Sequence, residues 1–169
     1  MSNEQPIVIN EWNIFAHPCF LRQVEALVVE VEQLSQKYPE NYKQKNATKR
    51  LAAIAKLAFK VIPQDPTRQE YRQGTTLGDD YKHWFRAKFY QQYRLFFQYR
   101  GEDKIIVFGW VNDTQSKRSY KNNTDAYDVF KKMIDKWLVT LCGALTKCNA
   151  PYKICEHWSK SPYREGFLL

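Results

Sequence analysis

Three short runs in the middle of the chain, residues 84–89, 93–99 and 104–111, are rich in aromatic and β-branched side chains. Such runs predict β-strands when turn residues separate them. Residues 90–92 and residues 101–103 are each few enough to close a hairpin. The pattern therefore predicts an antiparallel meander of three strands.

The first of these strands has two different faces, because successive side chains of a strand point to opposite sides. The alternation predicts a cationic face formed by Trp84, Arg86 and Lys88. The opposite face is apolar and is formed by Phe85, Ala87 and Phe89. Arg94 follows directly after the first turn. We expect the hairpin to gather Arg86, Lys88 and Arg94 into one exposed positive patch, which suits a polyanion.

Helical spacing of apolar residues predicts three helices. The first covers residues 20–37 and ends ahead of Pro39, and the second runs from about Asn41 and ends at Pro63. Thr124 or Asp125 is expected to cap the third helix. Its apolar stripe extends to Leu145 and is expected to pack on the apolar face of the sheet. The fold class predicted is therefore α+β.

The remaining segments connect these elements. Residues 12–20 are apolar with a proline break and predict an arm that packs before the first helix. Residues 64–80 predict a long loop, and residues 118–120 a short final strand. Residues 1–146 are expected to form one domain. Residues 147–169 show no clear period and are expected to be a loosely docked tail.

Charge is concentrated where the strands are predicted. The chain has 169 residues and a formal net charge of +8, and residues 82–121 carry nine basic and three acidic side chains. Twelve of its 26 aromatic residues lie between Tyr81 and Tyr120. Interleaved cations and aromatic rings are typical of single-stranded nucleic-acid surfaces. The alternative is a sheet core of aromatic residues beneath a solvated cationic face.

A second basic stretch lies on the second helix. Residues 41–62 contain six basic residues and no acidic one. Their side chains either extend the positive field of the strands or form an ordinary solvated face, and the pattern leaves both readings open.

Other chemistry is poorly supported by the sequence. No apolar run approaches the ~20 residues of a membrane span, and no signal peptide is evident, so we expect a soluble, cytoplasmic protein. The four cysteines form no paired motif. Cys148, Cys155 and His157 match no zinc spacing, and we therefore predict neither a metal nor a cofactor.

Several segments resemble the YhaV toxins, ribosome-associated mRNA interferases of the RelE/ParE superfamily. The resemblance spans about residues 12–140 and is carried by AHPCF, PENYKQKNATKRLA, YRQGTTLG, HWFRAKF, QYRLFFQY, GWVND and TDAYDVFKKM. Many matches in one order make a chance resemblance improbable. The tail from Lys147 does not fit the pattern.

The resemblance implies a RelE-like fold, with two N-terminal helices, an antiparallel sheet of three to four strands whose open face meets RNA, and a C-terminal helix. It implies mRNA as substrate, association with the ribosome, and a labile PrlF-type antitoxin that silences the toxin, with operator DNA bound only through the antitoxin complex. The positions that match the catalytic pattern are Arg86, Lys88, Arg94, Arg118 and Tyr120.

RNA cleavage without a metal needs a base for the 2′-OH, positive charge for the transition state and an acid for the leaving oxygen. The histidines give no obvious catalytic pair, and only His83 borders the hairpin. We therefore expect Arg86 and Arg94 to hold phosphate. Lys88, whose pKa should fall between two arginines, or Tyr120 is the better proton-transfer group. Two alternatives are a ParE-like gyrase poison and a non-catalytic RNA-binding module.

Overall fold

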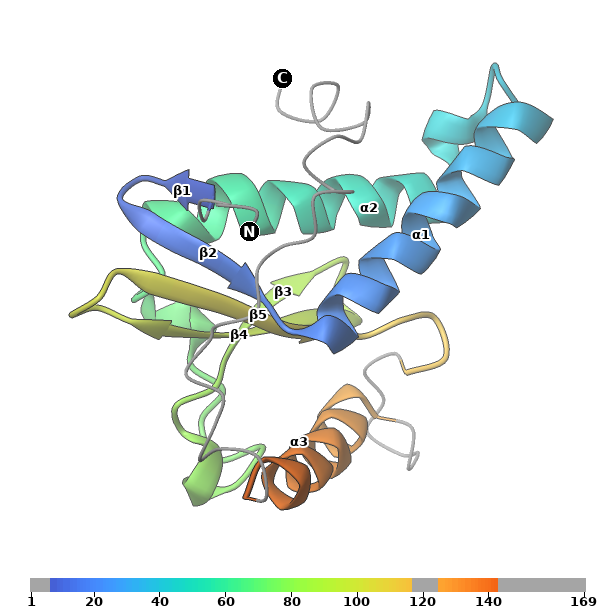
Figure 1. Cartoon of the computed structure of the whole chain (residues 1–169). Helices are drawn as coiled ribbons and strands as arrows, with labels where there is room; N and C mark the ends of the chain where they lie inside the picture. The colour runs from blue at the N-terminus through green and yellow to red at the C-terminus, as the bar shows by residue number, and fades with distance from the viewer. Residues whose placement is uncertain (1–6, 117–124, 143–169) are drawn as a thin grey trace, which may run out of the picture.

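The computed structural model describes residues 7–116 and 125–142, with side chains in the last helix as far as Lys136. It contains a central sheet with α1 (Pro18–Lys37) and α2 (Asn46–Lys56) on one side and α3 (Ala126–Cys142) on the other (Figure 1). The strands are β1 (Ile7–Ile9), β2 (Trp12–Ala16), β3 (Phe85–Phe89), β4 (Tyr93–Arg100) and β5 (Ile105–Val111). The α+β class is confirmed. The boundary expected at residue 147 lies outside the described residues.

The sheet has five strands in the order β1-β2-β5-β4-β3. The meander β3-β4-β5 is antiparallel, as the sequence predicted, but β2 pairs with β5 in parallel. An antiparallel sheet of three to four strands is therefore wrong in both count and character. The predicted short strand at residues 118–120 lies outside the part of the chain that the structure describes.

The two additional strands lie at the N-terminal end of the described chain: β2 falls within residues 12–20, which were expected to be an arm, and β1 precedes them. β1 and β2 form an antiparallel hairpin whose turn residues, Asn10 and Glu11, have φ angles of 47° and 69°. β2 then pairs through Phe15 with Val107 of β5. Because this parallel pairing joins segments about ninety residues apart, no local pattern could predict it.

The first two helices cover one side of the sheet. His17 caps α1, because its Nδ1 accepts a hydrogen bond of 3.1 Å from the Cys19 amide, and Pro18 occupies the first turn. α1 ends at Lys37, as predicted. The second helix is interrupted: a 3₁₀ turn at Tyr42–Gln44 precedes α2, a π-helical turn at Leu57–Val61 follows it, and a 3₁₀ turn at Ile62–Gln64 includes Pro63.

Both faces of the sheet are apolar at their centres. Leu95, Phe97 and Phe108 pack with α1 and α2, whereas Phe96 and Trp110 pack with α3. Strict alternation would put Phe108 and Trp110 on the same side. A bulge separates them, because Phe97 pairs with Phe108 but Phe96 pairs with Trp110, which leaves Gly109 as the extra residue.

Gly109 is required at this bulge. A Cβ atom there would lie 2.5 Å from Cζ3 of Trp84. The Trp84 ring packs edge-on against Phe130 of α3, with 4.9 Å between centroids. Close approach of the indole to the sheet backbone therefore depends on the missing side chain.

The third helix lies on the face that was expected to be cationic and open, so its predicted placement on the other face is wrong. Trp84 and Phe96 belong to the same face as Arg86, and Phe130 stacks on Phe96 with centroids 4.1 Å apart. The aromatic side chains on this face require an apolar cover, and α3 supplies it. Asp125 caps α3 through a 2.9 Å bond from the Tyr127 amide, as predicted.

Within the described residues, none of the helices combines the length and the apolar character needed to cross a membrane.

Candidate active site

The β3-β4 hairpin brings three of the predicted site residues to one face. Lys88 pairs directly with Arg94, and Arg86 pairs with Phe96 two residue pairs further along, which is the next pair on the same face. Partners in an antiparallel ladder share a face, so Arg86, Lys88 and Arg94 lie together. The other two predicted residues, Arg118 and Tyr120, lie outside the described residues.

The alternation predicted an exposed Arg86, but its side chain is half-buried. Its Nε donates a hydrogen bond of 2.6 Å to the hydroxyl of Tyr127 in α3, and its Nη1 donates one of 3.0 Å to the carbonyl oxygen of Glu70. Tyr127 is itself only 6% exposed and packs edge-on against Phe96. The guanidinium is therefore fixed between the last helix and the loop that precedes β3.

Arg94 does not form an exposed patch with the other two cations. It is 6% exposed, and its Nη1 donates hydrogen bonds to the carbonyl oxygens of Gln91 (2.6 Å) and Tyr93 (2.8 Å). Among the residues that the structure describes, its buried Nε has no hydrogen-bond partner. The buried Arg94 side chain therefore stabilises the hairpin turn, whereas the neighbouring Lys88 side chain is exposed to solvent.

Asn112 closes the base of the hairpin. Its Oδ1 accepts a hydrogen bond from the Arg94 amide, and its Nδ2 donates to the carbonyl oxygens of Gln92 (3.0 Å) and Ser116 (2.8 Å). The side chain is completely buried. The Asn112 part of the GWVND segment thus joins the start of β4 to the turn after β5, which gives a structural reason for an amide at this position.

Asp113 organises that turn. Its Oδ1 accepts hydrogen bonds from the amides of Gln115 and Ser116 and from the Ser116 hydroxyl, at 2.8–2.9 Å. Burial acts to raise the pKa of this carboxyl, but the hydrogen bonds and the charge of Arg50 outweigh it, so that its pKa lies below the ordinary value. Asp113 is therefore an ionised structural group.

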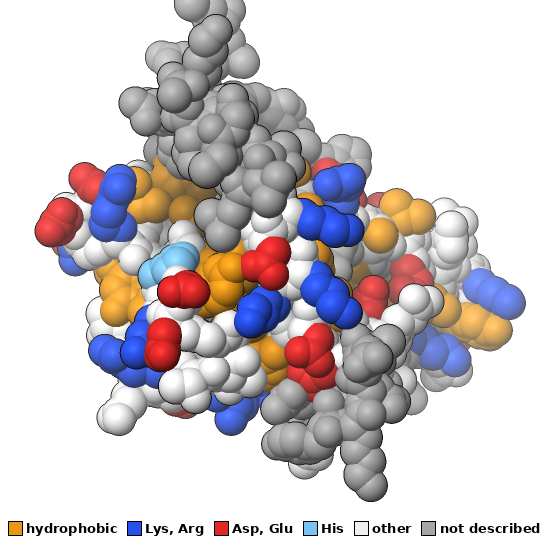
Figure 2. Space-filling model, turned by 90° about the horizontal axis from the view of Figure 1, so that it is seen from below, with side chains coloured by type: hydrophobic (Ala, Val, Ile, Leu, Met, Phe, Trp, Pro, Cys, Tyr) orange, Lys and Arg blue, Asp and Glu red, His pale blue; other side chains and the backbone are white. Residues whose placement is uncertain are grey.

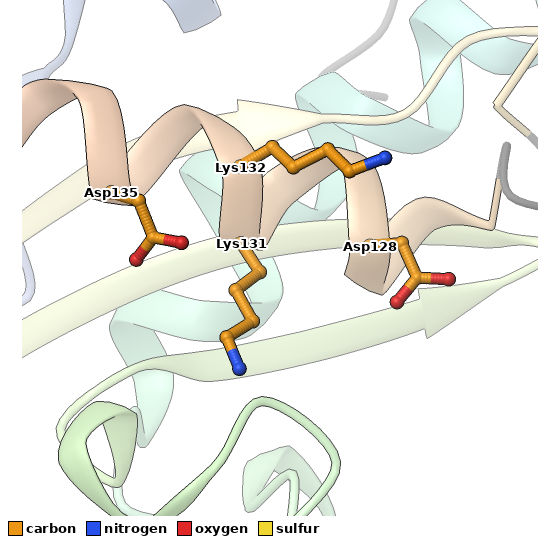
Figure 3. Close-up of a pocket in the computed structure, with 4 residues that line it drawn as sticks. All are labelled: Asp128, Lys131, Lys132 and Asp135. Carbon is orange, nitrogen blue, oxygen red and sulfur yellow. The ribbon is translucent and has the colours of Figure 1, made fainter.

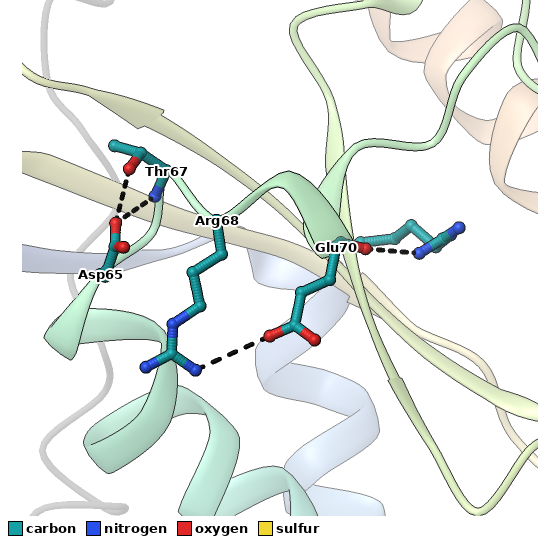
Figure 4. A network of polar contacts seen from close by, with 5 residues as sticks. Asp65, Thr67, Arg68 and Glu70 are labelled. Carbon is teal, nitrogen blue, oxygen red and sulfur yellow. Dashed lines mark hydrogen bonds and ion pairs between the residues drawn. The ribbon is translucent and has the colours of Figure 1, made fainter.

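The loop before β3 is held by its own side chains. Gln73 donates from Nε2 to the Tyr81 carbonyl (3.0 Å) and accepts from the Leu77 amide (2.9 Å). Nearby, Asp65 binds Thr67, and Arg68 forms an ion pair of 3.6 Å with Glu70 (Figure 4). Glu70, whose carbonyl oxygen accepts from Arg86, lies in the 3₁₀ turn Gln69–Tyr71, and its exposed ion pair adds little to the stability of that turn.

A second contact joins the loop to α3. The Tyr81 hydroxyl donates a hydrogen bond to Asp135, and this bond is the main cause of a raised pKa for Tyr81. Asp135 lies with Asp128, Lys131 and Lys132 around a small pocket on the outer side of α3 (Figure 3). Seen from the side of α3, acidic and basic side chains lie interspersed on the described surface (Figure 2). This surface is not a uniform positive patch.

The two histidines in the described part of the chain lie in different environments. His17 caps α1, and His83 is exposed beside Tyr81 and Trp84. Within residues 7–116 and 125–142, no three His, Cys, Asp or Glu side chains are grouped to hold a metal ion. Cys148, Cys155 and His157 lie outside these ranges.

Sequence reasoning missed Tyr127 and Glu70. Tyr127 was read only as part of an apolar stripe, and Glu70 acts through its backbone oxygen, which carries no sequence signal. A tyrosine at the start of a helix stripe, one turn before the buried Phe130, gave the only available indication that a hydroxyl enters the sheet face.

The sequence matches the family model described as a toxin with endonuclease activity, of a toxin-antitoxin system, over residues 14–137. It is also 45% identical over 133 residues to the ribonuclease toxin YhaV of Escherichia coli (strain K12). The matched segment covers 78% of this chain and 86% of that protein. The chain belongs to the YhaV toxin family. The toxin YhaV of Escherichia coli O157:H7 matches to the same extent. No solved structure matches the chain.

Membership of the YhaV family bears on the alternatives. The family is one of endonucleases, and its toxins act within toxin-antitoxin systems, so an antitoxin is the expected partner. A gyrase poison without nuclease activity and a non-catalytic RNA-binding module both disagree with that description. The resemblance of the chain to the YhaV toxins is thereby confirmed.

Proposed function

We propose that the protein is a ribonuclease toxin that cleaves mRNA by attack of a 2′-OH on the adjacent phosphate, without a metal, and thereby inhibits translation and growth. The observation that carries the proposal is the fixed guanidinium of Arg86 beside Lys88 on the β3-β4 hairpin. Family membership supports the nuclease activity, and the name of the relative, ribonuclease toxin, supports RNA as its substrate.

Arg86 is proposed to stabilise the charge that develops on the phosphate oxygens. A guanidinium has five N–H groups, and Tyr127 and Glu70 engage two of them. The other N–H groups can donate to phosphate while these two bonds hold the plane of the group. Such pre-positioned donors lower a barrier because they need not reorganise during the reaction.

Tyr127 is proposed as a positioning residue for Arg86. It reaches the site from α3 and is locked by burial and by its contact with Phe96. Its hydroxyl accepts from Arg86 and so fixes the orientation of the guanidinium without itself touching the reacting atoms. This role couples the docking of α3 to catalysis.

The other predicted site residues remain part of the proposal with adjusted roles. Lys88, exposed on the same face, is proposed to contact phosphate or to transfer a proton, and Arg118 and Tyr120 to complete the site. Arg94 is proposed to contribute positive charge from beneath the turn and to keep the hairpin rigid, because its Nη1 is engaged by the turn carbonyls.

A RelE-like fold agrees with the β3-β4-β5 meander and its flanking helices, although β1 and β2 enlarge the sheet. We further propose a PrlF-type antitoxin, action on the ribosome in the cytoplasm, and operator DNA binding only through the antitoxin complex. An antitoxin segment that covers Lys88 or displaces α3 would silence the site. The tail from residue 147 is proposed to lie outside the toxin domain.

The proposal is tested by incubating the purified protein with a defined mRNA, with and without ribosomes, and mapping the cleaved positions. We expect specific cuts in at least one of these conditions. The absence of cuts in both, with a folded protein, would overturn the proposed activity. Growth arrest accompanied by DNA breaks during continued protein synthesis would instead support a gyrase poison.

A further inference from the structure

Tyr90, at the tip of the β3-β4 hairpin, is a large aromatic residue placed where an aromatic side chain is costly. Its ring is 56% exposed, and its φ angle of 43° lies in the left-handed region that non-glycine residues rarely adopt. Gln91, the next residue, is also left-handed with φ of 58°. Glycine or asparagine would satisfy this turn at lower cost. The turn therefore holds an aromatic ring in solvent at some expense in stability.

The ring is held toward the second helix. The Tyr90 hydroxyl donates a hydrogen bond of 3.3 Å to the carbonyl oxygen of Lys49 in α2. Phe89 packs edge-on against Tyr90 from the strand side, with 5.8 Å between centroids. Tyr90 thus bridges the hairpin that carries Lys88 and the helix that carries Lys49, both of which are exposed.

From Tyr90 onward, α2 and the π-helical turn after it offer a row of positive charges. Lys45, the N-cap of α2, begins the row with its Nζ 4.5 Å from the centroid of the Tyr38 ring. Spacings of seven and four residues place the following three lysines along one side of the helix: Lys49, Lys56 and Lys60. At 1.5 Å per residue the row is about 20 Å long. No acidic residue lies between positions 41 and 62, and none of the ion pairs found in the described part of the chain uses one of these lysines.

We propose that Tyr90 and the α2 lysine row form a binding track for single-stranded RNA that continues from the cleavage site around the hairpin tip. The Tyr90 ring stacks on a base, and the lysines contact successive phosphates. Exposed aromatic rings next to a cationic groove are how proteins hold single strands without reading their sequence. Lysine suits this role because it supplies a point charge and imposes no bidentate geometry.

RNA is favoured over an acidic protein segment by the aromatic ring. The lysines alone would attract a carboxylate-rich segment, whereas the exposed ring offers a nucleic-acid base a surface on which to stack. The position also fits a substrate strand. β3 is the edge strand of the sheet, so a strand that leaves Lys88 can pass over the hairpin tip to α2. The inference rests on the proposed ribonuclease function, because that function supplies the RNA.

The test is the affinity of the full chain for a fluorescently labelled 2′-O-methyl RNA strand, whose blocked 2′ oxygens prevent cleavage. Tyr90→Leu should weaken binding by about 5- to 100-fold, the usual range for loss of one stacked base, and leave its salt dependence unchanged. Tyr90→Phe, which keeps the ring, should retain most of the affinity. Both variants keep a side chain in the same left-handed turn, so a comparison of the two isolates the ring.

The lysine row is tested by the slope of affinity against salt. Lys49→Ala and Lys56→Ala should each reduce that slope by about 0.7, the value expected for one phosphate contact with a single strand. Arg100→Ala is the matched control, because Arg100 is exposed on the far end of β4 and paired with Asp103. It should bind RNA as the unmodified protein does.

The outcomes separate this inference from the proposed function. The RNA track would be overturned if Tyr90→Leu kept its affinity and Lys49→Ala kept its salt slope, even if Arg86→Ala abolishes cleavage. An acidic protein would then be the better partner for the α2 surface. Failure of the unmodified protein to cut mRNA would overturn the ribonuclease activity, whatever the binding data show. Weaker binding in Tyr90→Leu but not in Tyr90→Phe supports the track.

Discussion

At the scale of single residues, Arg86 is the hairpin cation that we propose for catalysis, because two hydrogen bonds hold it while its side chain stays partly exposed. Replacing it by Ala should slow RNA cleavage by on the order of 10²-fold or more, because a transition-state contact is lost. The half-buried side chain also makes two hydrogen bonds, so unfolding should become easier by about 1–3 kcal/mol. Cleavage kinetics and denaturant unfolding of the same preparation measure both effects.

Arg100→Ala provides the comparison for Arg86→Ala. Arg100 is exposed and forms only a surface ion pair with Asp103, which is worth little. It should cleave at nearly the rate of the unmodified protein. Equal activity of the two variants, both folded, would remove Arg86 from the active site.

Tyr127 can be distinguished from a residue that only docks α3. Tyr127→Phe removes the hydroxyl that Arg86 binds, whereas Tyr81→Phe removes a hydroxyl that also joins α3 to the sheet side but does not touch Arg86. We expect Tyr127→Phe to lower kcat about tenfold with little change in KM, and Tyr81→Phe to leave both nearly unchanged. In an Arg86→Lys background the Tyr127→Phe change should have no further effect.

If Tyr127→Phe and Tyr81→Phe lower kcat equally, Tyr127 acts only through the docking of α3. The same conclusion would follow if the Tyr127→Phe effect persisted unchanged in the Arg86→Lys background. Thermal unfolding of each variant shows whether the loss of either hydroxyl destabilises the fold.

At the scale of elements, the start of α1 depends on an uncharged histidine. Burial, and then the charge of Arg22, lower the pKa of His17 below 6.5. The unfolded chain therefore binds a proton more readily than the folded one, so the stabilising contribution of His17 is present above about pH 6.5 and declines as pH falls through that value. Neutral Nδ1 is also the acceptor for the Cys19 amide.

His17→Asn tests this pH dependence, because asparagine caps helices well and does not titrate. The free energy of unfolding should fall less between pH 7 and pH 5 in His17→Asn than in the unmodified protein. The measurement is denaturant unfolding at a series of pH values. An identical decline in both proteins would show that other groups cause it.

Local patterns predicted the elements whose partners are near in sequence. The meander β3-β4-β5 follows from alternation and short turns, and α1 ends at Lys37 as its stripe indicates. The β1-β2 hairpin was missed although it is local, because its apolar run was interpreted as an arm, and the parallel pairing of β2 with β5 was missed because those strands are distant in sequence. The side on which α3 packs was missed for a different reason: the bulge at Gly109 redirects Trp110 to the face of Arg86, and alternation alone cannot show a bulge.

The candidate site was predicted only in part, because some of its contacts join residues that are distant in sequence. Spacing placed Arg86, Lys88 and Arg94 on one face correctly. It could not show that Arg94 folds back onto the carbonyl oxygens of its own turn, nor that Tyr127 reaches Arg86 from α3. These are tertiary contacts, and side-chain alternation carries no information about which exposed positions another element will cover.

At the scale of the whole molecule, the sheet separates the main apolar core from the candidate site. α1 and α2 form the main apolar core on one side, and the hairpin with α3 forms the candidate site on the other (Figure 1). α3 both covers the aromatic residues and holds Arg86. If Arg86 acts as proposed, a partner that shifts this helix would change activity without contacting RNA, and we propose this as a second route to inhibition by an antitoxin, besides blocking of Lys88.

The proposed chemistry also predicts which bonds the whole enzyme makes and breaks. Attack of the 2′-OH forms a bond from the 2′ oxygen to phosphorus and breaks the bond to the 5′ oxygen, which takes up a proton. The products should be a 2′,3′-cyclic phosphate and a 5′-hydroxyl end. Water activated by a metal would instead cleave strands that lack a free 2′-OH.

The decisive measurement is therefore cleavage of an mRNA in which the nucleotide before a mapped cut carries a single 2′-O-methyl group. Cleavage at that position should disappear while other cuts in the same molecule persist, which provides an internal control that leaves ribosomes intact. Any cleavage found without ribosomes should also survive EDTA, since arginine and lysine, not a metal, stabilise the phosphate charge in this proposal. Cleavage at the methylated position, lost with EDTA and restored by Mg²⁺, would contradict the mechanism and require ligands beyond the hairpin cations.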